Sequence, residues 1–401
     1  MENTNDFQVA VVGAGPVGCV GALIMARAGF SVLLVEAERE LPVDLRASTF
    51  HPPTLDMLDS LGLTRFLIDA GLIASRYQYR DRSSGLYAEF DLGVLQGIVE
   101  HPFRVQCEQF KLTRHVVSLL EDMPNAQVRM GTTLQHYTQD EQGVCIRLQS
   151  GDEVDEIQCD YLIGADGSRS QVRQVMGTEF EGFTYPEQFL VVATDNPLEE
   201  QLPNLAHVNY ISAADEWCVV LRVVDSWRVL FPTDPDADSD LLKDEQQIEE
   251  RLQRLAPRED RYNVLHKSLY RIHQRVAKSY RQGRVLLAGD AAHLNNPLGG
   301  MGMNGGLHDV FNLSEKLIAV LQGTASDSLL DLYDRQRRTV TWDFVQKQTI
   351  ENKRRIENAD ENARMDRIHE LRGIAADTPA AIDYLKHHNM IDALECAAAI
   401  R

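Results

Sequence analysis

The sequence predicts an α/β protein with a parallel sheet, an inserted β-rich block and a helical C-terminal region. Apolar strands at 7–12, 159–164 and 285–288 each end in a turn rich in Gly or Asp, and helical patterns follow them. From Pro186 onward, short apolar runs alternate with turn signals, which is typical of antiparallel strands. After Leu329 the chain is charged and helical in pattern.

The N-terminal segment has the order of a dinucleotide-binding unit. Residues 7–12, FQVAVV, predict a buried strand, and GAGPVG at 13–18 matches G-x-G-x-x-G. A helical pattern extends from Pro16 to Ala28, and a second apolar strand at 31–35 ends at Glu36. The glycine pattern is weak alone, but strand, helix and acidic residue in this order predict a Rossmann-like βαβ unit.

Each residue of this unit has a physical role. Gly13 makes the turn, Gly15 lets a diphosphate approach the backbone, and Gly18 lets the helix pack on the strand. The helix starts at Pro16, where free amides and the positive end of the helix dipole favour a diphosphate. Glu36 is placed to accept hydrogen bonds from an adenosine ribose. NAD and FAD both remain open at this point.

The segment 283–313 has a strand, a Gly-Asp turn and a glycine-rich loop that leads into a helix. Gly289 allows the backbone to bend, and Asp290 offers a carboxylate at the strand end, where α/β sheets usually hold ligands. Pro297, Gly299, Gly300, Gly302 and Asn304 suit a tight loop whose amides face a flat, electron-accepting group. The alternative is an ordinary Gly- and Asp-rich connection.

A third motif completes a pattern. Residues 159–173, CDYLIGADGSRSQVR, form an apolar strand that ends in Asp166 and Gly167 and continues to Arg173. The order GAGPVG, then DGxxSxxR, then GDAAHxxxPxGGxGxN resembles the single-component flavoprotein monooxygenases, the family of para-hydroxybenzoate hydroxylase. The resemblance covers residues 7 to about 340.

The resemblance implies FAD as the cofactor. It implies that Asp166 and Arg173 shape the diphosphate region and that Asp290 binds a ribityl hydroxyl. Pro297 would lie near the flavin and the substrate, and the backbone amides of Met303 and Asn304 would meet the pyrimidine edge of the ring. The residues expected to bind FAD are Gly13, Gly15, Pro16, Gly18, Glu36, Arg46, Ala47, Gln106, Leu134, Asp166, Arg173, Gly289, Asp290, Pro297, Gly300, Gly302, Met303 and Asn304.

Three of these assignments rest on shorter matches. Arg46 in LRAST would lie against the FAD phosphates, unless it is an ordinary surface arginine. Gln106 would contact the ribityl chain or ribose, although a glutamine at a helix start is an equal alternative. Leu134 would contact the adenine through its backbone.

Composition is consistent with an enzyme of two domains that share one cofactor. The 401 residues include 40 basic and 60 acidic side chains, and a formal charge of −20 argues against nucleic acid or an anionic membrane as a partner. Neither a signal peptide nor an apolar run of membrane-spanning length is expected. The six cysteines are scattered, which predicts no metal site and no disulfide framework. A cytoplasmic monomer or homodimer is expected.

The remaining helix, turn and charge patterns indicate how the chain is divided into domains. Helices are predicted after His51, from Glu108 to Leu120 and near 244–255, and a hairpin turn at Asp225-Ser226. The charged run 351–367 predicts a solvated helical face. The expected domains are a discontinuous FAD-binding domain at 1–75, 104–183 and 283–330, a β-rich substrate domain at 76–103 and 184–282, and a helical C-terminal region at 331–401.

The implied function is hydroxylation of a small aromatic or N-heteroaromatic substrate that carries a hydroxyl or carboxylate. NADH or NADPH and O2 would be the co-substrates, and the oxygen would pass through a flavin C4a-hydroperoxide. The same fold also hosts epoxidases and reductases of non-aromatic substrates, and a non-catalytic nucleotide-binding protein is a further alternative. The W-x-W-x-I-P signature of halogenases is absent from the sequence.

No catalytic residue carries over from the family, so the candidates are local. His51 could orient or deprotonate a substrate group, and Tyr210 could donate to a substrate oxygen; a helix entry and a packed tyrosine are the alternatives. Arg222 lies in the apolar strand CVVLRVV, where an inward side chain would require an anionic substrate and an outward one would be solvated. Pro297 is the fourth candidate.

Overall fold

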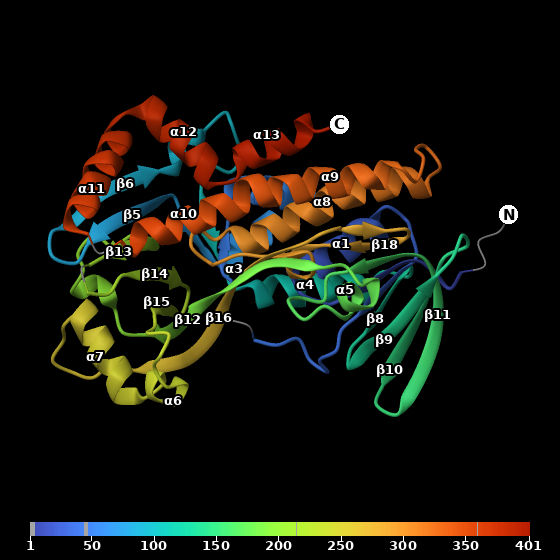
Figure 1. The fold of residues 1–401 in the computed structure, drawn as a ribbon, viewed down its shortest axis with the longest axis horizontal. Coiled ribbons are helices and arrows are strands. Elements are labelled where there is room, and N and C mark those ends of the chain that lie inside the picture. The colour runs from blue at the N-terminus through green and yellow to red at the C-terminus, as the bar shows by residue number, and fades with distance from the viewer. Residues whose placement is uncertain (1–4, 44–46, 214, 359) are drawn as a thin grey trace.

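The computed structural model describes residues 5–43, 47–213, 215–358 and 360–401. This part of the chain contains two eight-stranded sheets and one three-stranded sheet. Figure 1 shows the first large sheet towards the N-terminal end and the second near the opposite end, with long helices running along both.

The first sheet has a parallel centre. Its strands are β1 (Phe7–Val12), β2 (Val32–Val35), β8 (Ala126–Arg129), β9 (Thr132–Gln139), β10 (Val144–Ser150), β11 (Glu153–Gly164), β17 (Arg281–Gln282) and β18 (Val285–Leu287). The order is β17-β18-β11-β1-β2-β8, and β10 and β9 extend the sheet from β11 as an antiparallel arm. β1, β2 and β18 are apolar because helices cover this sheet.

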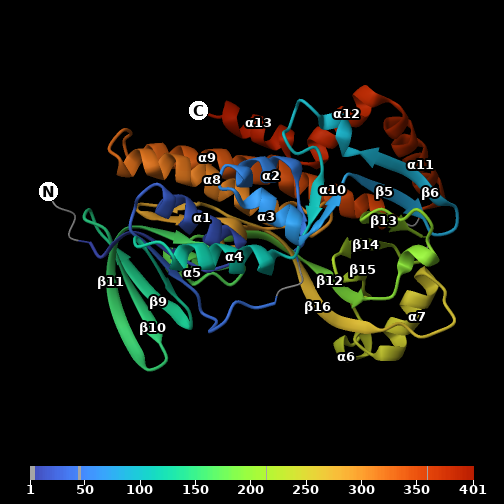
Figure 2. The same ribbon diagram turned by 180° about the vertical axis from the view of Figure 1, so that it is seen from behind.

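Helices surround this sheet and bring glycine-rich turns to its edge. They are α1 (Pro16–Arg27), α2 (Pro52–Asp59), α3 (Leu63–Ala70), α4 (Gln109–Glu121), α5 (Gln171–Met176), α8 (Met301–Leu321) and α9 (Leu329–Val340). α1 packs against both α4 and α8 (Figure 2). The predicted boundaries of α1 and α4 differ from the observed ones by one residue at each end or less.

The second sheet is mainly antiparallel. Its strands are β5 (Arg76–Asp81), β6 (Gly85–Asp91), β12 (Phe180–Thr194), β13 (Val208–Ser212), β14 (Cys218–Val223), β15 (Ser226–Pro232), β16 (Val264–Ala277) and β19 (His293–Leu294). The order is β19-β16-β12-β15-β14-β13-β5-β6, with β13 and β5 parallel. The hairpin turn between β14 and β15 is at Val224-Asp225, one residue before the predicted position.

One face of this sheet packs on a short helical segment. α6 (Ser239–Leu242) precedes α7 (Glu245–Leu255), and α7 buries Ile248 and Leu252 against Val220 and Trp227. Because side chains alternate along a strand, Val219 and Leu221 of β14 point to the opposite face. That opposite face is the one that can meet a ligand.

A small third sheet has the order β3-β7-β4. Its strands are β3 (Thr49–Phe50), β4 (Leu72–Ala74) and β7 (Arg104–Gln106). Short 3-10 turns at Leu92–Leu95, Leu198–Glu200 and Gly289–Ala291 complete the connections.

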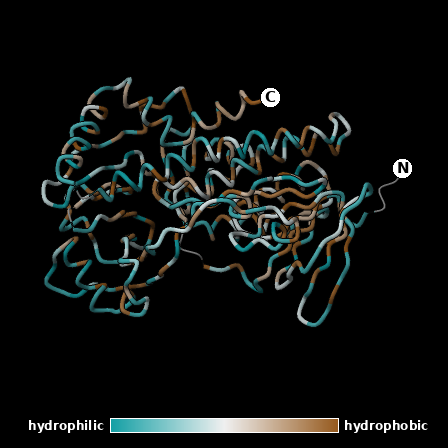
Figure 3. Tube along the Cα trace, in the orientation of Figure 1, coloured by the Kyte–Doolittle hydropathy of each residue, from teal (hydrophilic) through white to brown (hydrophobic). Residues whose placement is uncertain are grey.

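The C-terminal region is helical and covers the end of the second sheet. After a π-helical turn at Thr341–Gln346 come α10 (Lys347–Ile356), α11 (Glu361–Ala376), α12 (Thr378–His388) and α13 (Ile391–Ala399). Leu371 and Leu385 pack with Tyr77 and Phe90 of the sheet. Hydrophilic and hydrophobic residues alternate along these helices in Figure 3, which fits one buried and one solvated face. Among the described residues, no helix is long and apolar enough to span a bilayer.

Candidate active site

A long cavity of about 960 Å³ runs from the end of β1 to the second sheet. We call it the long cavity. Twelve of the residues expected to bind FAD line it, and they come from five separate segments of the chain. They are Gly13, Gly15, Pro16, Glu36, Ala47, Leu134, Asp166, Asp290, Pro297, Gly300, Gly302 and Met303.

The turn between β1 and α1 is built around three glycines. Gly13 has a φ of +104°, and a Cβ there would lie 2.3 Å from the Ala165 carbonyl oxygen. A Cβ on Gly18 would lie 1.9 Å from the Gly13 carbonyl oxygen, so Gly18 allows the close packing of helix on strand. A Cβ on Gly15 would meet nothing within 4 Å. The protein backbone is therefore open to a ligand at Gly15, beside the N-terminus of α1.

Glu36 lies next to this turn. Its carboxylate accepts hydrogen bonds from the backbone N–H of Ala14 at 2.7 Å and of Glu38 at 2.9 Å. The carboxylate thus holds the turn and lines the long cavity at the same time. This is the position from which an acidic side chain reaches an adenosine ribose.

Asp166 and Arg173 have different environments. Asp166 accepts a hydrogen bond from the Val172 N–H at 3.1 Å, while its buried Oδ1 has no protein partner. Burial raises the pKa of Asp166. Arg173 does not line the cavity; it donates to the carbonyls of Ala291 and Ser168 and so connects the loops that follow β18 and β11.

A buried ion cluster supports the Gly-Asp turn from behind. The Asp309 carboxylate accepts from the Gly289 N–H at 3.0 Å, from His293 Nε2 at 2.7 Å and from Arg337 Nε at 2.7 Å. Burial alone would raise the pKa of Asp309, but the charges and hydrogen bonds of His293 and Arg337 outweigh it and lower the pKa to about 2. The cluster holds Gly289 in place and leaves Asp290 facing the cavity.

The N-terminus of α8 forms the next part of the wall. Gly300 caps the helix with a φ of +70°, and Gly302 and Met303 of the first turn line the cavity. Backbone N–H groups in a first helical turn have no intrahelical acceptor, and the dipole of this 21-residue helix favours negative charge there. Asn304 is fully buried; its side chain binds the backbone of His51, Thr49 and Gly300 and so fixes the loop.

One residue expected to bind FAD, Gln106, is not among the residues that line the long cavity. Gln106 is fully buried, accepts a hydrogen bond from Thr49 Oγ1 at 3.0 Å and does not line the cavity. Gln109, three residues later at the start of α4, lines it instead. Arg46 lies outside the described residues.

Two of the four catalytic candidates do not reach the cavity. Arg222 pairs across the strands with Trp227 and lies over its ring at 5.4 Å, on the face packed against α7. Of the two alternatives for Arg222, the structure fits the outward one, because the even-numbered residues of β14 face away from the long cavity. His51 is fully buried, and both its ring nitrogens lack a protein partner; burial and the nearby Arg104 lower its pKa well below the usual value. Tyr210 and Pro297 do line the cavity.

The end of the long cavity at the second sheet is mostly apolar. Val219, Leu221 and Leu230 line it from β14 and β15, next to Leu298 of the glycine-rich loop. Such a surface packs on a flat ring and excludes water. Arg104 of β7 is a charged side chain of this cavity that the sequence analysis missed, and it is 2% exposed; Arg271 of β16 also lines the cavity but is exposed.

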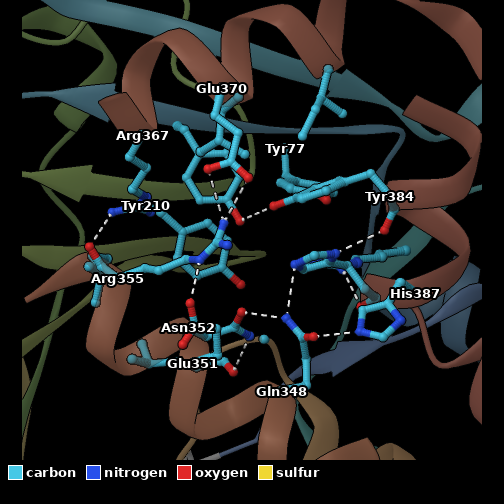
Figure 4. A pocket seen from close by; sticks show the side chains of 18 residues that line it. Tyr77, Tyr210, Gln348, Glu351, Asn352, Arg355, Arg367, Glu370, Tyr384 and His387 are labelled. Atoms are coloured by element: carbon cyan, nitrogen blue, oxygen red, sulfur yellow. Dashed lines mark hydrogen bonds and ion pairs between the residues drawn. The ribbon is translucent and has the colours of Figure 1, made fainter. Parts of the chain in front are cut away.

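A second, smaller cavity of about 250 Å³ adjoins the first, and we call it the tyrosine cavity (Figure 4). Tyr77 and Tyr79 of β5, Tyr210 of β13 and Tyr384 of α12 line it. Tyr79 and Tyr210 stack with their centroids 5.1 Å apart, and the Tyr79 and Tyr384 hydroxyls lie 2.8 Å apart. The two cavities share the residues Arg104, Tyr210, Leu298 and Gly299.

The C-terminal helices provide the other wall of the tyrosine cavity. Glu351, Asn352 and Arg355 come from α10, and Arg367 and Glu370 from α11. The run predicted as a solvated face therefore has one side that faces a cavity. The charge pattern alone could not predict this cavity, because it forms where these helices contact a strand about 270 residues earlier in the chain.

The long cavity fits FAD in shape and chemistry. It offers the open backbone at Gly15, the partnerless Asp166 Oδ1, the carboxylates of Glu36 and Asp290 and the first turn of α8 in one continuous space. Its volume is in the range of cofactor sites. Among the described residues, no group of three or more His, Cys, Asp or Glu side chains is placed to hold a metal ion.

Comparison with known proteins agrees with this fit. Residues 6–348 match the family described as FAD binding domain. The chain is 35% identical over 343 residues to para-nitrophenol 4-monooxygenase of Pseudomonas sp. (strain WBC-3), covering 84% of each chain. It is 33% identical over 353 residues to 6-hydroxy-3-succinoylpyridine 3-monooxygenase of Pseudomonas putida (strain DSM 28022 / S16), covering 87% of this chain and 88% of that protein.

Solved structures are similar over the same length. The crystal structure of p-nitrophenol 4-monooxygenase from Pseudomonas putida DLL-E4 superimposes with a TM-score of 0.92 at 29% identity, covering 98% of this chain and 99% of the other. Aklavinone-11 hydroxylase, solved with FAD and aklavinone, superimposes with a TM-score of 0.80 at 27% identity, covering 90% and 71%. The chain therefore belongs to the FAD binding domain family and is a single-component flavoprotein monooxygenase with FAD as its cofactor.

Proposed function

We propose that this enzyme hydroxylates a small aromatic or N-heteroaromatic ring that already carries a hydroxyl group, with O2 and NADH or NADPH as co-substrates. The observation that carries the proposal is the continuity of the long cavity. It joins the dinucleotide turn at Gly15 to the apolar face of the second sheet at Val219 and Leu221. A ring bound on that face would lie beside the first turn of α8.

The named relatives support a hydroxylated ring as the substrate class. Their printed names specify para-nitrophenol, 6-hydroxy-3-succinoylpyridine and pentachlorophenol, and each of these is an aromatic or heteroaromatic ring with a hydroxyl. The first two relatives match at least 84% of this chain.

The residue roles proposed for FAD follow the order of the cavity wall. Gly13, Gly15 and Pro16 hold the diphosphate at the N-terminus of α1, and Glu36 holds the adenosine ribose. The other contacts are Leu134 at the adenine, Ala47 and Gln109 along the middle of the cofactor, Asp166 near the diphosphate, Asp290 at the ribityl chain, and Gly300, Gly302 and Met303 at the pyrimidine edge of the ring.

At the reacting end, the chain binds, orients and dehydrates the substrate. FAD, when bound and reduced, would supply the oxygen chemistry of the hydroxylation. Val219, Leu221 and Leu230 exclude water and hold the flat ring, and Pro297 limits its approach to the cofactor. Tyr210 is placed to donate a hydrogen bond to a substrate oxygen from its position between the two cavities.

The domain roles and the setting belong to the same proposal. Residues 76–103 and 184–282 act as the substrate domain, and 1–75, 104–183 and 283–330 as the FAD-binding domain. We propose a cytoplasmic setting, supported by six cysteines that are all free thiols, and a monomer or homodimer.

Turnover by the FAD-loaded enzyme tests the proposal. NADH and NADPH oxidation is measured with a panel of phenols and hydroxypyridines, together with O2 uptake, peroxide release and product mass. The proposal expects a product 16 mass units heavier than its substrate for at least one ring, because insertion adds one oxygen atom. Nicotinamide oxidation that yields only peroxide across the whole panel would contradict it.

A further inference from the structure

The site contains a buried cation, Arg104, which lines both cavities. We propose that Arg104 binds the ionised oxygen of the substrate, so that the enzyme selects phenolate-type anions over neutral rings of the same shape. This rests on the proposed function, which it makes more specific. An inward Arg222, one of the two alternatives from the sequence, would have had the same role.

Arg104 lies where the two cavities meet. It is one of the four residues that line both, and its side chain is 2% exposed. The neighbouring wall of the long cavity is apolar, with Val219, Leu221 and Leu298. A ring packed on that wall would place a substituent within reach of the guanidinium.

The protein gives Arg104 only neutral partners. Its Nε donates to Asn389 Oδ1 at 2.9 Å, Nη2 has a long contact of 3.5 Å with the His388 carbonyl oxygen, and Cζ lies 4.7 Å from the centroid of the Tyr77 ring. Among the described residues no carboxylate forms an ion pair with it. A guanidinium has five N–H donors, so part of its capacity remains for a ligand.

The two carboxylates that line the tyrosine cavity are paired with other cations. Glu351 pairs with Arg354 and Arg355, and Glu370 pairs with Arg355. Arg367, the remaining cation of the tyrosine cavity, adds positive charge rather than removing it.

Arg104 contributes to the lowered pKa values of two buried histidines. Burial and then Arg104 lower the pKa of His51 well below its ordinary value. Burial lowers the pKa of His388 to about 3, and Arg104 contributes to the same effect. Both histidines are therefore neutral at physiological pH and leave the charge of Arg104 for a ligand.

A buried arginine without an acidic partner is costly, and an anionic ligand removes that cost. A phenolate oxygen, like a carboxylate, accepts charge-assisted hydrogen bonds from a guanidinium. Four tyrosine rings and the rings of His387 and His388 also line the tyrosine cavity, and they suit an anion that reaches Arg104 as a substituent of a flat ring.

The elements that hold Arg104 lie at the end of the chain. Asn389 and His388 follow or end α12, beyond the residues 6–348 that match the FAD-binding family. The C-terminal helices therefore position this cation for the substrate as well as covering the second sheet.

Calorimetric binding to the FAD-loaded, oxidised enzyme tests the proposal without turnover. The two probes are 4-nitrophenol and 4-nitroanisole, which have the same ring and nitro group, but only the phenol can ionise. The wild-type enzyme is expected to bind the phenol more tightly as pH rises through the phenol's ionisation, and to bind the anisole weakly at every pH. Equal affinity for both probes, or binding of neither, would overturn the proposal.

Three variants locate the effect. Arg104→Gln should lose about tenfold or more in affinity for the phenolate and keep its affinity for the anisole, because only the charged hydrogen bonds are removed. Arg104→Lys should keep a preference for the phenolate. Arg222→Gln is the matched control: it removes an arginine that also lies over an aromatic ring, but on the far face of the sheet, and should change neither affinity.

Unchanged phenolate affinity in Arg104→Gln would overturn the assignment, and so would a shift in flavin reduction potential with unchanged phenolate binding. If Arg104→Gln purifies without FAD, the wild-type comparison and Arg104→Lys still decide. These experiments measure binding, whereas the turnover panel measures hydroxylation. A negative result in one therefore does not decide the other.

Discussion

Asp290 is the single side chain whose role in cofactor binding is most open to test. It follows β18, lines the long cavity and is proposed to bind a ribityl hydroxyl. Asp290→Ala removes a hydrogen bond to a charged acceptor, worth about 1.5–3 kcal/mol, and should weaken FAD binding by about 10- to 100-fold. FAD titration of the apoenzyme measures this. Asp152→Ala, in the exposed turn between β10 and β11, is the control; equal affinity in the two variants would reject the role of Asp290.

Asp309 should control stability rather than chemistry. Its pKa in the folded protein is lowered to about 2, so its contribution to stability is fully present above the ordinary value of 3.8. That contribution is lost as pH falls towards 2. Asp309→Asn leaves Arg337 buried without its partner and should cost about 3–5 kcal/mol at pH 6.

Denaturant unfolding at pH 6, 4 and 2.5 tests this. The difference between wild type and Asp309→Asn should be similar at pH 6 and pH 4 and smaller at pH 2.5. Asp343→Asn breaks an exposed pair with Lys347 and should change stability by about 1 kcal/mol or less. A difference for Asp309→Asn that stays constant with pH would contradict the ionisation account.

Single residues also show where sequence reasoning reached its limit. The glycines and acidic residues of the three motifs could be placed because each motif is local. Arg222 could not, since one strand in isolation does not reveal which of its faces meets the ligand. Gln106 and Gln109 are both near the start of α4, and only the packing shows that Gln106 turns to Thr49.

In the turn from β1 to α1, Gly15 faces the space for a ligand, whereas Gly18 packs against the protein's own backbone. Gly15→Ala adds a methyl group where the protein has no atom within 4 Å, so folding should be retained while FAD affinity falls about tenfold or more, or 1.4 kcal/mol. Gly18→Ala places Cβ 1.9 Å from the Gly13 carbonyl oxygen and should lower the free energy of unfolding by at least about 1–3 kcal/mol.

Thermal unfolding of the apoproteins and FAD titration together check this contrast. Gly373→Ala in α11 is the control, because a Cβ there also meets nothing within 4 Å. This variant should leave FAD affinity unchanged and should not lower stability. If Gly15→Ala bound FAD like the wild type, the diphosphate would not lie at that turn.

The helices and strands were predictable to different degrees. α1, α4 and α7 could be located from their periodic patterns and starting residues. The role of α10 to α12 could not be inferred, because their cavity side is defined by contacts with β5. Tyr79 and Tyr384 share a hydrogen bond across 305 residues of sequence, which no local pattern signals.

At the scale of the whole molecule, the site lies where the two large sheets and the C-terminal helices meet. The parallel sheet supplies the cofactor end of the long cavity, the antiparallel sheet supplies an apolar wall, and the C-terminal helices form one wall of the tyrosine cavity. With a formal net charge of −20, the chain must bind anionic ligands through local groups such as helix N-termini and Arg104. The fold class followed from the motifs, whereas the second cavity required the assembled structure.

The central claim is that this flavoprotein inserts one atom of O2 into a hydroxylated ring. The most direct test is a single set of turnovers under ¹⁸O₂ in ordinary water, with NADH or NADPH and the ring that gave product in the panel. The account predicts a product that carries one ¹⁸O atom per nicotinamide oxidised in coupled turnover. A product whose added oxygen comes from water alone would contradict it.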